Sequence, residues 1–165
     1  MTTNPLRQVL SENIGKVLTP ELAREEAPAG YAIEFDFDAV WAFVHRMLPG
    51  LARAEKMTAI GLRRHGELIA GVIYEGFNGR NVWMHVAAIP GARWLVRGYL
   101  KACFLYPFTV CGCERVSGYV DDSNAAAKRF DEHLGFKPEA RLSGAAADGG
   151  DVILYAMWKK DCRHV

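Results

Sequence analysis

The chain has 165 residues, of which 50% are hydrophobic and 24% are charged, and its formal net charge is +1. This length and composition predict one ordinary globular domain over residues 1–165, large enough to bury a core. The near-zero net charge argues against a protein that binds nucleic acid or an anionic membrane through its overall charge.

The N-terminal half predicts a lead-in, one helix and three strands. Residues 1–30 are polar, and we expect little regular structure there beyond one helical turn after Thr19-Pro20. Apolar side chains recur with a helical period from Asp38 to Leu48, which predicts an amphipathic helix capped by Asp38. Three short β-type runs, separated by Gly-containing turns, predict an antiparallel meander over residues 57–63, 67–74 and 81–88.

The C-terminal half returns to helices and ends on strands. A helical period runs from Ala92 to about Val110, but an interior proline costs about 3 kcal/mol, so the helix kinks or ends at Pro107. Strand, helix and two strands then follow over residues 114–120, 124–134, 136–142 and 151–158. This order predicts an α+β domain with a mixed, mostly antiparallel central sheet flanked by helices.

The helix that begins near Asn124 has clear end signals. Asp122 or Ser123 would cap its first turn, with Asn124 already inside the helix. Gly135 suits the left-handed residue that follows a helix, and Phe136 would pack back on the sheet.

The junction between the third strand and the long helix, residues 87–95, has two interpretations. A helix that starts at Ala92 would offer unpaired N–H groups and the positive end of its dipole, with Arg93 and Arg97 adding charge, so an anion could bind there. The simpler alternative is a Pro90-Gly91 turn with no ligand.

The cysteines indicate neither a metal site nor a redox pair. Cys111 and Cys113 lack the two-residue spacer of zinc and redox motifs, and no histidine stands at ligand spacing from them. We interpret all four cysteines as reduced, mostly buried thiols. The sequence shows no secretory signal, and the longest apolar stretch, 102–113, is too short to span a bilayer. We therefore expect a cytoplasmic protein.

One stretch carries a family resemblance: CGCERVSGYVDDSNAAAKRFDEHLGF, residues 111–136. It resembles the GNAT superfamily of N-acetyltransferases, and its nearest pattern is that of the ribosomal-protein N-terminal acetyltransferases. The matching positions are Asn124, Ala127, Arg129, Leu134, Gly135 and Phe136. The resemblance covers roughly residues 55–160. Residues 91–108 also resemble acetyltransferase-like proteins of tailed phages.

The resemblance implies transfer of an acetyl group from acetyl-CoA to an amine. In this family the sheet is splayed after the third or fourth strand, which admits the cofactor arm. The implied contacts are Val86, Ala87 and Ala88 with the thioester and the arm, Asn124 with the arm or a bound water, and Ala127 with the cofactor. The pyrophosphate would meet the loop residues Gly91, Ala92, Arg93, Trp94, Leu95 and Val96.

The chain departs from the family pattern at three positions. Ala92 and Trp94 stand where the phosphate loop has glycines, and Trp94 would crowd the pyrophosphate. Asp131 stands where many members have a tyrosine that protonates the departing thiolate.

Three side chains are candidates for proton transfer. His85 lies on the strand that leads to the splay, and histidine is the usual general base near neutral pH. Strand alternation turns it away from the face of Val86, however, so a core or surface role is an alternative. Glu75 is the second candidate base and Tyr119 a candidate acid.

Two functions from different classes remain. The first is an N-acetyltransferase that acts by direct amine attack, without a covalent enzyme intermediate, on a small-molecule or peptide acceptor bound by residues 25–55 and 143–150. The second is an inactive GNAT-fold protein that serves as a binding or assembly module, including a virion-associated one. Both functions are compatible with a homodimer, and for neither function do we expect a membrane or a nucleic acid as a partner.

Overall fold

The computed structural model describes residues 28–165, and its centre is one seven-stranded sheet with the strand order β1-β2-β3-β4-β5-β7-β6. Only β4 and β5 run parallel, and every other neighbouring pair is antiparallel. The strands are β1 (Tyr31–Glu34), β2 (Thr58–Arg64), β3 (Glu67–Glu75), β4 (Asn81–Ala88), β5 (Arg115–Asp121), β6 (Lys137–Leu142) and β7 (Val152–Trp158). The predicted α+β class with a mixed, mostly antiparallel sheet is confirmed.

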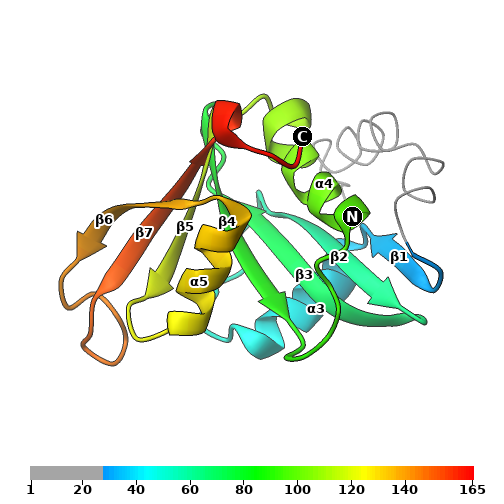
Figure 1. The fold of residues 1–165 in the computed structure, drawn as a ribbon. Coiled ribbons are helices and arrows are strands. Elements are labelled where there is room, and N and C mark those ends of the chain that lie inside the picture. Colours follow the sequence, from blue (N-terminus) through cyan, green and yellow to red (C-terminus); the bar gives the residue numbers. More distant parts are fainter. Residues whose placement is uncertain (1–27) are drawn as a thin grey trace.

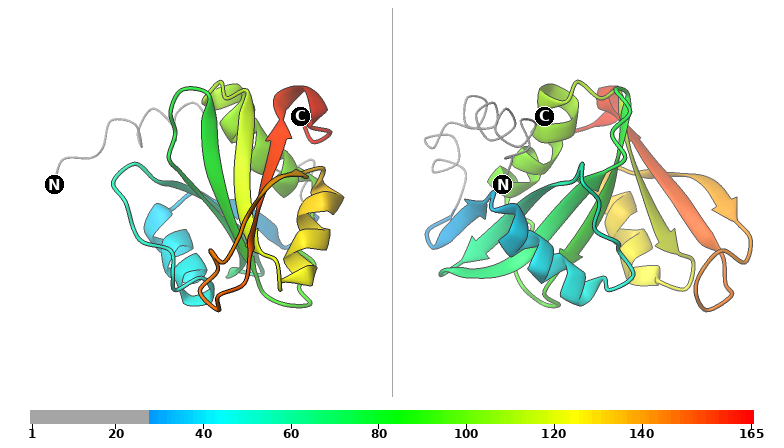
Figure 2. Two further views of the ribbon diagram at one scale, coloured as in Figure 1. Left: turned by 90° about the vertical axis from the view of Figure 1, so that its left-hand side faces the viewer. Right: turned by 180° about the vertical axis from the view of Figure 1, so that it is seen from behind.

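Helices cover both faces of this sheet. Helix α3 (Phe37–Met47) lies on one face, and helices α4 (Arg97–Leu105) and α5 (Ala125–Leu134) lie on the other (Figures 1 and 2). The α3 face buries Val40 and Val44 against Ile73 and Ala87. The α4–α5 face holds the larger core, which is rich in aromatic side chains. None of the helices described is long and apolar enough to cross a membrane.

The predicted meander is confirmed as β2, β3 and β4, whereas two details before it were wrong. Asp36, not Asp38, caps α3, because its Oδ1 accepts from Ala39 N at 2.8 Å and the helix begins at Phe37. Strand β1 was not predicted; it pairs antiparallel with β2, from Tyr31 opposite Arg64. The predicted lead-in over 1–30 and the turn after Thr19 fall, apart from residues 28–30, outside the described residues.

The long helix starts later than predicted. Residues 89–96 form an irregular loop, and α4 begins at Arg97 after the extended residue Val96. At its other end, Pro107 falls within a five-residue π-helix, Tyr106–Val110, so the helix widens there instead of stopping. In a π-helix each N–H group bonds to the carbonyl five residues back instead of four. Proline has no N–H group, so near the start of such a turn it leaves no donor without a partner.

Helix α5 confirms the predicted end signals but corrects its cap. Asn124 is itself the N-cap, since its Oδ1 accepts from Ala127 N at 3.0 Å, and neither Asp122 nor Ser123 takes that role. Gly135 follows the helix with φ +110°, a left-handed conformation that glycine adopts without strain. Phe136 is buried in the α4–α5 core.

Replacing the cap should weaken α5 by a small, measurable amount. Asn124→Ala removes the hydrogen bond to Ala127 N, and we expect the free energy of unfolding to fall by about 1 kcal/mol. Asn124→Asp restores the acceptor and should recover most of that loss. Ser123→Ala is the matched control, and urea denaturation measures all three. A loss in Ser123→Ala equal to that in Asn124→Ala would contradict the assignment of the cap.

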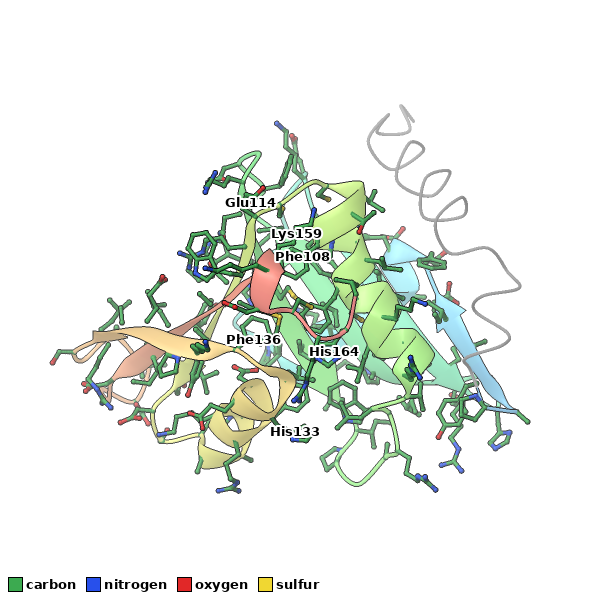
Figure 3. The ribbon with its side chains drawn as sticks, turned by 45° about the horizontal axis from the view of Figure 1, so that its top comes forward. Phe108, Glu114, His133, Phe136, Lys159 and His164 are labelled. Carbon is green, nitrogen blue, oxygen red and sulfur yellow. The ribbon has the colours of Figure 1, made fainter. Side chains whose placement is uncertain are left out.

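The C-terminal tail closes the α4–α5 face. The His164 ring stacks on Phe104 with ring centroids 4.8 Å apart, and its Nε2 lies 2.9 Å from the Leu134 carbonyl oxygen. Arg163 donates to the His133 carbonyl. Figure 3 shows His164 beside the end of α5, next to His133 and Phe136. The tail thereby joins α4 to the end of α5.

Candidate active site at the strand splay

Strands β4 and β5 pair over three positions only and then separate. Their parallel register runs from Asn81 opposite Arg115 to Trp83 opposite Ser117. Beyond that point β4 continues to Ala88 with pairing only to β3, and β5 continues to Asp121 with pairing only to β7. Two facing strand edges are therefore left without a strand between them (Figure 1). Unpaired backbone groups of this kind are available to a ligand.

The three candidate proton-transfer residues meet at this splay. His85 Nε2 lies 2.6 Å from Glu75 Oε1, and the Tyr119 ring stands edge-on to the His85 ring with centroids 5.4 Å apart. In the β3–β4 register Ile73 faces His85 and Glu75 faces Trp83, so these side chains share one face. The same alternation puts Tyr119 on that face, the one covered by α3.

The Glu75 bond fixes which nitrogen of a neutral His85 is basic. An ionised carboxylate only accepts hydrogen bonds, so Nε2 carries the proton and Nδ1 keeps its lone pair. Partial burial, followed by the Glu75 and Asp121 carboxylates, raises the pKa of Tyr119. The phenol therefore keeps its proton at neutral pH, while Nδ1 can accept one.

Sequence reasoning did not single out Trp83 and Asp121 as site residues. The Trp83 and Tyr119 rings meet edge to face with centroids 6.2 Å apart. Asp121 lies two residues beyond Tyr119 on the same strand face. The available signal was the strand period, because each residue stands two positions from a candidate that the sequence had already singled out.

The implied cofactor-arm residues of β4 divide between the two faces. Val86 and Ala88 pack against the α4–α5 core, and Ala87 is buried on the α3 side. All three residues lie on the part of β4 whose other edge is unpaired and faces the splay. Because successive strand residues direct their backbone groups to opposite edges, a ligand in the gap would meet those of Val86 and Ala88, whereas the backbone groups of Ala87 face β3.

The N-terminus of α4, where the sequence predicts an anion site, lies five residues later than predicted. Val96 is the N-cap and makes no side-chain capping bond, so the N–H groups of Arg97, Gly98 and Tyr99 have no helical acceptor. Gly98 adds no side chain at this point, and Arg97 adds positive charge. Residues Gly91 to Val96 form the loop that leads to this helix start rather than the start itself.

Trp94 occupies the space between α4 and α5. Its ring lies 5.0 Å from that of Phe130 on α5 and 6.4 Å from that of Tyr99 on α4, measured between centroids. The Tyr31 hydroxyl donates to the neighbouring Arg93 carbonyl at 2.8 Å and ties the loop to β1. Trp94 is thus part of the core packing on this face.

The four thiols are free and poorly suited to nucleophilic attack. Burial raises the pKa of Cys103 to about 12 and that of Cys113 to about 11, and burial also raises the pKa of Cys111 and Cys162. A thiol attacks as its thiolate, which these cysteines hardly form near neutral pH. Within residues 28–165, no group of three His, Cys, Asp or Glu side chains could hold a metal ion.

Asp131, on the inward side of α5, makes folding stability depend on pH. Burial and, second, the Glu132 carboxylate raise the pKa of Asp131 from 3.8 to about 7. Between these values the folded chain binds more protons than the unfolded chain, so the free energy of unfolding falls as pH rises. Asp131→Asn lacks this titration, and its stability relative to wild type should increase from about pH 4 to about pH 8. Urea denaturation at both values measures this, and a pH-independent difference would contradict it.

Comparison with known proteins identifies the fold. The sequence matches no protein-family model and no curated protein. The structure is similar to a spermidine N-acetyltransferase from Vibrio cholerae, with a TM-score of 0.65 and 14% identity over 81% of this chain and 96% of that chain. A mutant of that enzyme gives a TM-score of 0.67 and 13% identity over 81% and 96% of the two chains. A protein described as a putative acetyltransferase gives a TM-score of 0.63 and 16% identity over 82% of this chain and 89% of that chain. This is the GNAT fold.

The GNAT fold accounts for the splayed sheet and for the helix that follows β4. Identities of 13–16% establish this fold but not an activity or a substrate. The chemistry has to be argued from the residues at the splay.

Proposed function

We propose that this protein is an N-acetyltransferase that moves the acetyl group of acetyl-CoA to a primary amine by direct attack. The observation that carries the proposal is the hydrogen-bonded His85–Glu75 pair at the splayed strands, with Tyr119 beside it. Solved spermidine N-acetyltransferases that share the fold support the reaction class.

His85 serves as the general base. An amine attacks only after it loses a proton, and a base must lie within hydrogen-bond reach of that proton or one water away. With Nε2–H held by Glu75, the lone pair on Nδ1 takes the proton from the ammonium. Glu75 acts through His85 as a positioning residue and stabilises the imidazolium that forms.

Tyr119 serves as the general acid. Its phenol carries a proton at neutral pH because burial and two carboxylates raise its pKa. It gives that proton to the departing thiolate as the carbon–sulfur bond breaks and the carbon–nitrogen bond forms. Backbone N–H groups on the free edge of β4 stabilise the oxyanion. Direct attack is favoured because none of the cysteines readily forms a thiolate.

The residues of the α4–α5 side fit an acyl-CoA at its two ends. The free edge of β4 between Met84 and Ala88 would hold the arm, and the uncapped N-terminus of α4 would hold a phosphate. Asn124 and Ala127 lie at the start of α5, and the implied contact of Asn124 competes with its bond to Ala127 N. Trp94 would move, or stack on the ligand, when an arm enters.

Calorimetric titration with acetyl-CoA and with CoA tests this proposal. We expect saturable binding of both, weakened by the double variant Arg93→Ala/Arg97→Ala, which removes the positive charges beside the α4 start. If no heat of binding is seen at millimolar ligand, the proposed enzyme activity is contradicted and the alternative, a GNAT-fold binding or assembly module, is favoured.

The predicted homodimer is tested separately, by light scattering on the same samples.

A further inference from the structure

A pocket of about 200 Å³ lies at the edge of the sheet, where β6 begins beside the end of β7. Its lining comes from the start of β6, the last three residues of β7 and the 3-10 helix η2 (Lys159–Asp161) that follows. Strands β5 and β7 separate it from the splay (Figure 1). A water molecule takes about 30 Å³ in the liquid, and drug-sized ligands need about 300 Å³ or more, so the pocket suits one small organic molecule.

The pocket holds two unpaired charges of opposite sign. Its charged side chains are Lys137, Glu139 and Asp161. Glu139 is already neutralised, because Arg115 donates to both of its carboxylate oxygens, at 3.0 and 2.7 Å. Within residues 28–165, Lys137 and Asp161 form no ion pair, either with each other or with another side chain. A simple anion or cation would meet one attractive and one repulsive charge here, whereas a zwitterion can satisfy both.

The backbone of Trp158 is open to the same pocket. Because the Lys159 N–H bonds to the Glu114 carbonyl next to β5, Trp158 directs its own N–H and C=O to the β6 side. The last β6–β7 pair on that side joins Lys137 to Ala156, and β7 continues for two more residues without a partner strand. Both backbone groups of Trp158 therefore stand where one more β6 residue would have bonded them.

The remaining walls of the pocket are apolar and held in place. The Arg115 guanidinium carbon lies 5.5 Å from the centroid of the Trp158 ring, and Arg115 also donates to Ser117 Oγ at 3.1 Å. The indole is thereby fixed at the pocket wall. Met157 and Pro138 supply further apolar surface, against which a short aliphatic group can be buried.

We infer that this pocket binds a free α-amino acid in its zwitterionic form. The ligand carboxylate accepts from the Trp158 N–H and lies beside Lys137, and the ligand ammonium donates to the Trp158 C=O and lies beside Asp161. These are the two hydrogen bonds that an opposite strand residue would make, each strengthened by a charge. The aliphatic side chain packs on Met157 and Pro138. The inference goes beyond acetyl transfer and does not rest on it.

L-Leucine and two analogues test the inference. 3-Methylbutylamine is leucine without its carboxylate, and 4-methylpentanoate is leucine without its ammonium. The readout is the indole N–H signal of Trp158, assigned with Trp158→Phe, in NMR titrations of the full chain without acetyl-CoA. Leucine should shift this signal saturably and bind about fivefold or more tightly than either analogue, because each analogue lacks one ion pair and its hydrogen bond.

Two variants should separate the two charges. Lys137→Gln should weaken leucine binding about threefold or more and should not weaken binding of 3-methylbutylamine. Asp161→Asn should weaken leucine binding to a similar extent and should not weaken binding of 4-methylpentanoate. Lys160→Gln is the matched control, because Lys160 is the neighbour of Asp161 but does not line the pocket. All three side chains are exposed, so these substitutions leave the core intact.

Three results would overturn the inference: no shift of the Trp158 signal with leucine, equal affinities for leucine and its analogues, or an effect of Lys160→Gln equal to that of Lys137→Gln. A leucine-induced shift confined to the Trp83 signal would place the amine at the splay and would also overturn it. Acetyl-CoA titration decides the proposed function separately. Leucine binding at Trp158 in a chain that binds no acetyl-CoA would support this inference and contradict the transferase.

Discussion

His85→Gln is expected to lower kcat by about a hundredfold or more, since a positioned general base typically contributes 10²–10⁴-fold. Glutamine keeps a polar side chain next to Glu75 but has no lone pair that can take a proton from an ammonium. The KM for acetyl-CoA should change little, because the implied contacts with the cofactor arm are made by backbone groups on the free edge of β4 and not by the His85 side chain. Steady-state kinetics with a saturating amine measures both constants.

Two further variants make this result specific. His133→Gln changes an exposed histidine on α5 and should leave kcat unchanged. Glu75→Gln should lower kcat less than His85→Gln does. Its amide oxygen can still accept from Nε2–H and keep Nδ1 basic, whereas its amide nitrogen can instead donate to Nε2 and place the proton on Nδ1, so only part of the activity is lost. Wild-type kcat in His85→Gln, with an unchanged melting temperature, would exclude His85 as the base.

Much of the candidate site could be predicted because its signals are local. Residues 67–74 and 81–88 are predicted as strands from their own side chains, and the short turn between them favours antiparallel pairing. The end of α5 at Gly135 was likewise predicted from a local signal, whereas its cap was placed at Asp122 or Ser123 instead of Asn124. Glu75, His85 and Tyr119 were all candidates in the sequence because each stands on a strand next to the splay.

The remainder depends on pairing between distant segments. Whether Glu75 reaches His85 depends on the register that sets Ile73 opposite His85, and a shift of one residue would turn either side chain to the other face. The approach of Tyr119 depends on the parallel β4–β5 pair, which joins segments more than 30 residues apart. Strand β1 has only four residues, and its pairing with β2 holds it in the sheet.

The predicted start of α4 at Ala92 was wrong for a related reason. The apolar period continues backward through Leu95, so the sequence alone extends the helix to Ala92. In the structure Leu95 is exposed and Trp94 packs against Phe130 of α5, and this contact favours a loop over five more residues of helix. Tertiary packing here overrides local propensity.

Phe104→Ala is expected to be the most destabilising of these substitutions, lowering the free energy of unfolding by about 3–5 kcal/mol. Phe104 is 1% exposed, and its ring contacts those of Phe108, Phe136 and His164 at centroid distances of 6.3, 6.1 and 4.8 Å. Truncation leaves a cavity where α4, the π-helix, the end of α5 and the C-terminal tail meet. Urea denaturation measures the loss, with the exposed Leu95→Ala as the control.

The same ring holds the tail, so the effects of two substitutions should not add. His164→Ala alone removes a stacked ring and its contact with the Leu134 carbonyl. In a double-mutant cycle with Phe104→Ala we expect a coupling of about 0.5–1.5 kcal/mol, the range for paired rings. Additive losses would mean that the tail contributes to stability independently of Phe104. A measurable coupling would place the C-terminal residues in the same cooperative unit as α4, the helix whose N-terminus lies beside the implied phosphate site.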